Sequence, residues 1–205
     1  MTEGHDLDAL NASSRSLKRL LRSHGYPANL ISAVETRALR SGRRLTGVFR
    51  SNRQSRWQLI HDHPEYGTDP QYGTEADCKA ILIQLLLTTL EFRNAPQIEH
   101  PEVGALCRRY LGRELQPGSY RDMLLLESLD FEQLRAEAEA PEPGRSSFHI
   151  GHIVPTMVPR HVPRNVAWRT LRSNLIQGDM TLREARIYII RLIARYFELG
   201  EIEVT

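Results

Sequence analysis

The chain has 205 residues, of which 40% are hydrophobic and 25% charged, and its formal net charge is +2. Because it has no run of about 18 apolar residues and no signal-peptide pattern, we expect neither membrane insertion nor secretion. Its only cysteines, Cys78 and Cys107, are too few for a zinc ribbon or a disulfide framework, so we expect core cysteines and a reduced, cytoplasmic setting.

The first predicted elements are two helices and a basic hairpin. An N-cap at Ser13 or Ser14 predicts a helix over Arg15–His24, and a second helix is predicted over Asn29–Arg40. Leu45–Arg50 and Arg56–His61 are predicted to be short strands joined by a polar turn.

This N-terminal part is strongly basic. Residues 15–56 carry eleven Arg or Lys residues against one acid, a net charge of +10, whereas residues 57–144 carry −9. All but two of the chain's basic residues are arginine, which suits contact with phosphates and guanine edges, although GC-rich codon usage could also explain that preference. We predict nucleic-acid contacts from Arg40, Arg43, Arg44, Arg50, Arg53 and Arg56. A solvated basic surface without a ligand is the alternative interpretation.

The middle of the chain is predicted to be helical. Thr74 and Asp77 form a capping-box pattern before the most apolar segment, Cys78–Leu90, which we expect to be the central buried helix. Further helices are predicted at Pro101–Leu111, Tyr120–Leu129 and Phe131–Ala140. The Pro-, Gly- and Ser-rich stretch over residues 137–147 is the best linker candidate, which divides the chain into residues 1–140 and 141–205.

The C-terminal part has a different pattern. Phe148–Val154 and Asn165–Leu171 are predicted strands separated by a proline-containing loop. Thr181 and Glu184 form a capping-box pattern at the start of a helix over Leu182–Leu199. The predicted fold class is therefore α+β and mainly helical, with a strand–loop–strand–helix unit at the C-terminus.

Three histidines, His149, His152 and His161, lie within 13 residues of this unit. The chain reads His152-Ile-Val-Pro155, then Asn165-Val-Ala-Trp168, then Asn174-Leu-Ile-Gln-Gly-Asp-Met-Thr181. This order resembles the HNH (ββα-metal) endonuclease family over residues 148–199. In that family a histidine ends the first strand, an asparagine opens the second, and an Asn or His follows.

The resemblance implies a role for each residue. Phosphodiester hydrolysis needs an activated water, which a near-neutral histidine can deprotonate, and a divalent cation can stabilise the charge on the phosphate. By resemblance His152 is the general base, Asn165 braces its loop, and Asn174 is a ligand of Mg²⁺. The family's acidic metal ligand is replaced here by Gly151, so His149 is the expected substitute, and an N-donor would favour Mn²⁺ or another transition metal.

The resemblance also implies a function. We expect a metal-dependent endonuclease of the restriction or phage-defence kind that cuts double-stranded DNA and leaves 5′-phosphate and 3′-hydroxyl ends. A homodimer is expected because one HNH unit cuts one strand. His161, Arg172 and Gln177 are the expected nucleic-acid contacts within this unit. Two alternatives stay open: a catalytically degenerate HNH-fold DNA-binding protein, and an HNH toxin or effector nuclease.

Overall fold

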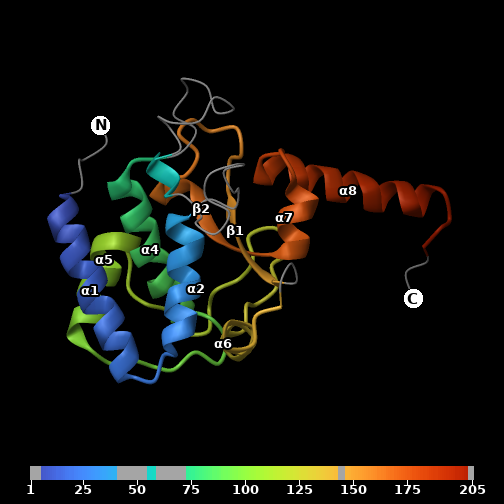
Figure 1. The fold of residues 1–205 in the computed structure, drawn as a ribbon. Coiled ribbons are helices and arrows are strands. Elements are labelled where there is room, and N and C mark those ends of the chain that lie inside the picture. The colour runs from blue at the N-terminus through green and yellow to red at the C-terminus, as the bar shows by residue number, and fades with distance from the viewer. Residues whose placement is uncertain (1–5, 41–54, 59–72, 143–145, 203–205) are drawn as a thin grey trace.

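The chain folds as a mainly helical α+β protein (Figure 1). The structure, a computed structural model, describes residues 6–40, 55–58, 73–142 and 146–202. The elements are α1 Leu7–Ser23, α2 Ala28–Leu39, the 3₁₀ turn η1 Arg56–Gln58, α4 Glu75–Thr89, α5 Pro101–Leu111, α6 Phe131–Glu139, β1 Phe148–His152, the 3₁₀ turn η3 Pro163–Asn165, β2 Val166–Thr170, α7 Leu171–Gln177 and α8 Leu182–Glu198. Within these ranges no helix is both long and apolar enough to cross a membrane.

Helix α4 is the centre of the fold. It begins with the predicted capping box, in which Thr74 and Asp77 bond each other's backbone N–H groups. Helices α1, α2 and α5 pack around it, so most of it from Cys78 onward is buried, as the apolar run of that segment requires. Cys78 on α4 and Cys107 on α5 are buried free thiols, as predicted, and burial raises the pKa of Cys78 to about 12. Neither is suited to act as a nucleophile.

The β1–β2 hairpin packs on the same core. The side chains of Phe148 and Trp168 are buried in the cluster that also contains α1, α2 and α4. The indole N–H of Trp168 donates to the Leu85 carbonyl of α4 at 3.0 Å, and Phe92 meets the indole edge-on with ring centroids 5.9 Å apart. The hairpin is thereby fixed to the helical part, while the predicted division near residue 140 stays a prediction.

The first helix starts earlier than predicted. α1 begins at Leu7, where the Asp6 carboxylate accepts a hydrogen bond from the Asp8 N–H at 3.0 Å. Ser14 is not a cap but a buried residue inside the helix. Asp6 is therefore the N-cap of the first helix, instead of Ser13 or Ser14.

The predicted helix over Tyr120–Leu129 is wrong. Residues 120–129 form turns, because the buried Asp122 carboxylate accepts the N–H groups of Leu124 and Leu125 at 2.8 and 2.9 Å. A short polar side chain that binds nearby backbone N–H groups competes with helix formation in this way.

The predicted basic hairpin is only partly described. Leu45–Arg50 lies outside the described residues, and Arg56–Gln58 is a 3₁₀ turn instead of a strand. Ser55 makes an isolated antiparallel bridge with Arg40, so this part of the chain returns to the end of α2.

Candidate active site

The two faces of the β1–β2 hairpin carry different residues. In its antiparallel register Ile150 lies opposite Trp168, His149 opposite Arg169, and His152 opposite Val166. Since side chains alternate along a strand, His152 shares the core-facing side with Ile150. His149, Gly151 and Arg169 share the other side, which α7 covers.

Asn165 holds the loop that follows His152. Its amide oxygen accepts the Val154 N–H at 2.7 Å, and its amide nitrogen donates to the carbonyls of Val154 and Arg160 at 3.0 and 2.8 Å. The Asn165 side chain is completely buried. These are the contacts of a loop brace, and the catalytic contribution of Asn165 stays a prediction.

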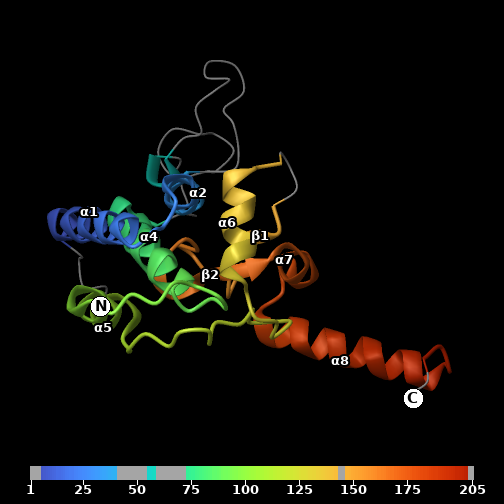
Figure 2. The same cartoon turned by 90° about the horizontal axis from the view of Figure 1, so that it is seen from below.

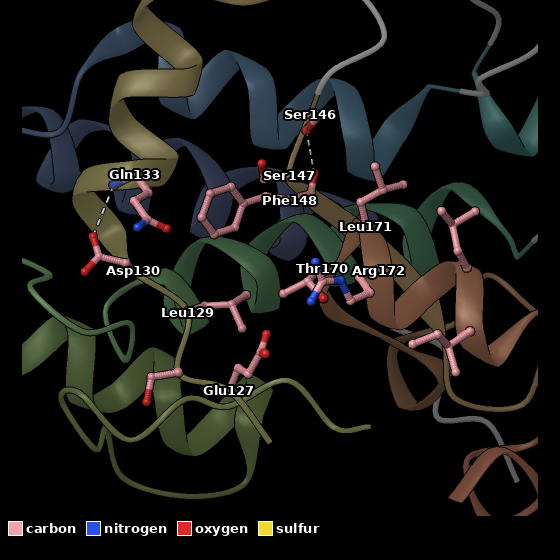
Figure 3. A pocket seen from close by; sticks show the side chains of 13 residues that line it. Glu127, Leu129, Asp130, Gln133, Ser146, Ser147, Phe148, Thr170, Leu171 and Arg172 are labelled. Atoms are coloured by element: carbon pink, nitrogen blue, oxygen red, sulfur yellow. Dashed lines mark hydrogen bonds between the residues drawn. The ribbon is translucent and has the colours of Figure 1, made fainter. Parts of the chain in front are cut away.

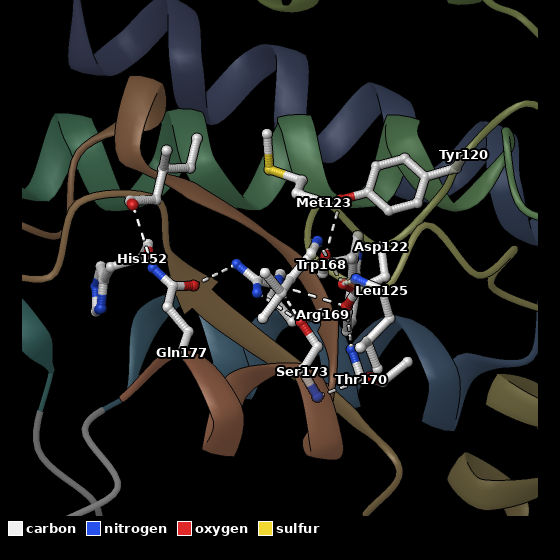
Figure 4. Close-up of polar contacts among 12 residues, drawn as sticks. Tyr120, Asp122, Met123, Leu125, His152, Trp168, Arg169, Thr170, Ser173 and Gln177 are labelled. Carbon is white, nitrogen blue, oxygen red and sulfur yellow. Dashed lines mark hydrogen bonds and ion pairs between the residues drawn. The ribbon is translucent and has the colours of Figure 1, made fainter. Parts of the chain in front are cut away.

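Gln177, at the end of α7, fixes the backbone of His152 from the other side. Its amide nitrogen lies 3.1 Å from the His152 carbonyl oxygen and 3.2 Å from that of Ile153. Its amide oxygen accepts from Nη1 of Arg169 at 2.6 Å (Figure 4). Gln177 is 1% exposed, so its predicted contact with DNA is wrong for this conformation, since its polar atoms serve the hairpin.

The imidazole of His152 points away from this network (Figure 4). Its Nε2 is buried and has no hydrogen-bond partner among the described residues. Burial, followed by the positive charges of Arg160 and Arg56, lowers the His152 pKa to about 4. The ring is therefore neutral at physiological pH and can accept a proton, but a pKa this low makes it a weak base. A phosphate bound beside the ring would raise the pKa towards neutrality, because its negative charge favours the protonated form.

His161 lies against His152, with ring centroids 5.8 Å apart in an edge-on arrangement. Its Nε2 donates to the Ala38 carbonyl of α2 at 2.8 Å, so the lone pair of the neutral ring is on Nδ1. Burial lowers the His161 pKa to about 3, with Arg56 as the next largest cause. Because His161 is fully buried, its predicted contact with nucleic acid is wrong for this conformation, and it supports the His152 ring instead.

On the α7 side, a buried ion pair occupies the interior. Arg169 and Asp122 are both fully buried, with Nε of Arg169 3.4 Å from the Asp122 carboxylate. Nε of Arg169 also donates to the Ser173 hydroxyl at 2.8 Å, and Asp122 accepts the Thr170 N–H at 2.9 Å. Burial acts to raise the Asp122 pKa, but its hydrogen bonds outweigh that effect and hold the pKa below its ordinary value.

The space beside Gly151 is narrow because the Arg169 side chain of this ion pair lies next to it. A Cβ atom at Gly151 would lie 2.7 Å from Oδ1 of Asn174 and 2.8 Å from Cγ of Arg169. At both distances a side chain at position 151, such as the carboxylate of the HNH pattern, would require Asn174 and Arg169 to shift. Asn174 lies beside Gly151, on the face of the hairpin opposite His152, and its role as a metal ligand stays a prediction.

We tested whether these residues fit a divalent cation. Nε2 of His149 is hydrogen-bonded to the Ser146 carbonyl at 2.9 Å, and Asn174 lies beside the side chain of Arg169. The described residues contain no group of three or more His, Cys, Asp or Glu side chains that could hold a metal ion. A neutral amide next to a positively charged side chain does not by itself fit Mg²⁺, which prefers carboxylate oxygens. The metal stays a prediction.

The predicted DNA-contacting arginines lie in different environments. Arg43, Arg44, Arg50 and Arg53 are outside the described residues. Arg40 donates to the Ser55 hydroxyl at 3.0 Å, and Arg56 donates to the Arg37 carbonyl at 3.1 Å.

Arg172 is exposed on α7, as a contact with nucleic acid requires. It lines a pocket of about 640 Å³ between α6, α7 and the start of β1 (Figure 3). Asp130 and Gln133 line the same pocket, but the Asp130 carboxylate caps α6 and binds Arg93, so it is already engaged.

The interior network was missed by sequence reasoning. Arg169 interrupts a five-residue strand that also contains Trp168, and a charged residue within a short buried strand is a signal for a buried partner. That partner, Asp122, is too distant in the sequence to be paired with it by spacing.

The chain was compared with protein-family models, curated proteins and solved structures, and the solved structures gave a match. No protein-family model and no curated protein matches the chain. A solved structure described as the crystal structure of a type II restriction endonuclease matches with a TM-score of 0.62 and 14% sequence identity. The match covers 88% of this chain and 81% of that one. The chain is therefore similar in fold to that restriction endonuclease over most of its length.

Proposed function

We propose that this chain is an endonuclease that hydrolyses DNA phosphodiester bonds with His152 as the general base. The observation that carries the proposal is the His152 ring, neutral and with Nε2 free of hydrogen bonds to the described residues. Because that Nε2 is buried in this conformation, the proposal requires that DNA binding open a path to it. Gln177 donates to the His152 carbonyl and Asn165 holds the loop that follows at Val154, so the backbone that carries the ring has a fixed position. The fold similarity to a restriction endonuclease and the HNH-like order of motifs support the same activity.

In the proposed reaction Nε2 of His152 takes a proton from a water molecule as that water attacks the phosphorus. The bond from phosphorus to the 3′ oxygen breaks, and the leaving oxygen takes a proton from solvent. The products are a 5′-phosphate and a 3′-hydroxyl. Arg160 and Arg56 provide a positive potential at the ring, which favours a neighbouring phosphate.

The biological role that fits this activity is restriction or phage defence, acting on double-stranded DNA. A toxin or effector nuclease would use the same chemistry on a different target. The basic segment over residues 15–56 favours a nucleic-acid substrate.

A second candidate function is DNA binding without cleavage. One observation favours it: Arg169 and Asn174 fill the space where the family's acidic metal ligand would stand. In that case the HNH-like unit would keep its architecture while lacking a metal.

A plasmid-nicking assay tests the proposal. Supercoiled plasmid is incubated with the wild-type chain in EDTA, Mg²⁺ or Mn²⁺, and nicked and linear products are measured. We expect nicking, and a loss of about 10²–10⁴-fold in rate for His152→Ala. The arm with EDTA tests the metal expectation separately.

His24→Ala is the matched control, because His24 is an exposed histidine at the end of α1. It should nick at the wild-type rate, and both variants should remain folded, as a cooperative thermal transition would show. Absence of nicking under all three conditions, or full activity of a folded His152→Ala, would overturn the enzyme proposal. A gel-shift measurement with the same DNA would then test the second candidate.

A further inference from the structure

Among the residues that the structure describes, helix α8 contacts the rest of the molecule only near its start. Ala185 is buried, and Nη2 of Arg186 donates to the Met123 carbonyl at 2.6 Å. From Ile190 to Ile202, every residue is exposed in the part of the chain that the structure describes. Figures 1 and 2 show the helix extending away from the body in both views.

This extending segment is apolar. Nine large hydrophobic residues on or just after α8 are between 36% and 66% exposed: Ile187, Tyr188, Ile190, Leu192, Ile193, Tyr196, Phe197, Leu199 and Ile202. With about 200 Å² as the full surface of one such residue, the nine expose on the order of 900 Å². These side chains lie on two opposite faces of α8, so each face exposes on the order of 400–500 Å², a size that commonly marks an interaction site on a monomer. The helix therefore needs a partner.

We propose that α8 is a dimerisation surface whose partner is α8 of a second copy of this chain, packed antiparallel. Ile187, Ile190, Ala194 and Phe197 follow the three–four–three spacing of a helix-pairing seam. The large residues of this one face, Ile187, Ile190, Ile193 and Phe197, expose on the order of 400 Å² with about 200 Å² as the full surface of each. This is about half of the roughly 800 Å² that each partner contributes to a standard interface, so the seam needs the charged flanks described next.

The charges on α8 favour the antiparallel arrangement. Its first turns carry Arg183, Glu184 and Arg186, a net charge of +1, and its last turn and the residues just after it carry Arg195, Glu198 and Glu201, a net charge of −1. When two copies align antiparallel, the basic start of each helix lies near the acidic end of the other, whereas parallel alignment places like charges together. Such a pairing is self-complementary, as a two-fold dimer requires.

The surface is inferred from exposure and charge alone and does not rest on the proposed catalytic activity. If both proposals hold, the dimer brings two copies of His152 to one DNA duplex, one for each strand.

Sedimentation or light scattering at micromolar concentrations measures the mass. We expect twice the 23.5 kDa of one chain for the wild type. Ile190→Glu combined with Phe197→Glu should give a monomer. The rest of the chain should stay folded, with an unchanged cooperative unfolding transition. Leu7→Glu is the matched control, since Leu7 is an exposed leucine on α1, and it should remain dimeric.

A crosslinking experiment tests the antiparallel geometry. Ile190 lies near the middle of α8, so Ile190→Cys should place two thiols close to the dimer axis and give a disulfide-linked dimer on oxidation. Cys78 and Cys107 are buried and do not interfere. A monomeric wild type, or a dimer that persists in the double glutamate variant, would overturn the proposal, whether or not the chain nicks DNA.

Discussion

The two faces of the β1–β2 hairpin use their polar side chains in opposite ways. On the α7 side, Arg169, Asp122, Ser173 and Gln177 satisfy one another, and their bonds are directed inward. On the other side, His152 and His161 each keep a buried ring nitrogen without a partner among the described residues.

The difference distinguishes residues that hold the hairpin in place from residues that are available for a reaction. A buried polar group that is fully hydrogen-bonded stabilises a conformation, whereas one left without a partner costs free energy and is retained where it has another use. The α7 side therefore holds the hairpin in place, and the His152 side is where we place the reaction. Three measurements can contradict or sharpen this distinction, beyond the tests of nicking and of dimer mass.

The largest stability effect is expected for Arg169→Met. This change leaves the Asp122 carboxylate buried without its cation, which should lower the free energy of unfolding by about 3–5 kcal/mol. Urea unfolding followed by circular dichroism measures it. Replacing both partners, as Arg169→Met with Asp122→Leu, should recover part of the loss, because no uncompensated charge remains. Equal losses for the single and double variants would show that the pair is not coupled.

The pH dependence of stability should come from the histidine side. The His161 pKa is lowered from 6.5 to about 3, so between these values the unfolded chain binds a proton that the folded chain does not. Stability is therefore complete above about pH 6.5 and falls as the pH drops, by up to about 1.4 kcal/mol per pH unit for this group.

Urea titrations between pH 7.5 and 4.5 check this slope. His161→Gln keeps a donor for the Ala38 carbonyl but removes the titration, so its stability should depend less on pH. An unchanged slope in the variant would assign the pH dependence to other groups.

A smaller effect is expected for Gly151→Ala. The added Cβ would press on Asn174 and Arg169, which should destabilise the fold by about 1–3 kcal/mol. Gly104→Ala on α5 is the control, since a Cβ there meets its nearest atom at 3.6 Å and alanine is the better helix former by about 1 kcal/mol. Thermal unfolding should therefore move in opposite directions for the two variants.

Much of the fold follows from local signals in the sequence. The capping boxes of Thr74 and Thr181 start helices at the predicted residues, and the apolar run of α4 becomes the centre of the core. The two strands form at the predicted places because turn and loop residues bound them. These features depend on contacts within a few residues.

The remainder depends on contacts between distant residues. The helix predicted after Tyr120 fails because Asp122 binds nearby backbone N–H groups and pairs with Arg169, and periodicity contains neither fact. The sequence also could not show whether the apolar residues of α8 lie in the core. The same apolar pattern is expected for a helix that packs within its own chain and for one that packs on another chain. The motif order likewise does not show that Asn174 and Arg169 both lie beside Gly151, because that depends on how α7 packs on the hairpin.

Trp168, whose indole N–H binds the Leu85 carbonyl, allows the packing of the hairpin on α4 to be followed by fluorescence. The chain has two tryptophans, and Trp168 is the one that is fully buried, at the junction of the hairpin with α4. Its fluorescence should be emitted at short wavelength while the hairpin is packed and shift to the red when water reaches the ring. In a Trp57→Phe background, this signal would report detachment of the hairpin separately from unfolding of the helices.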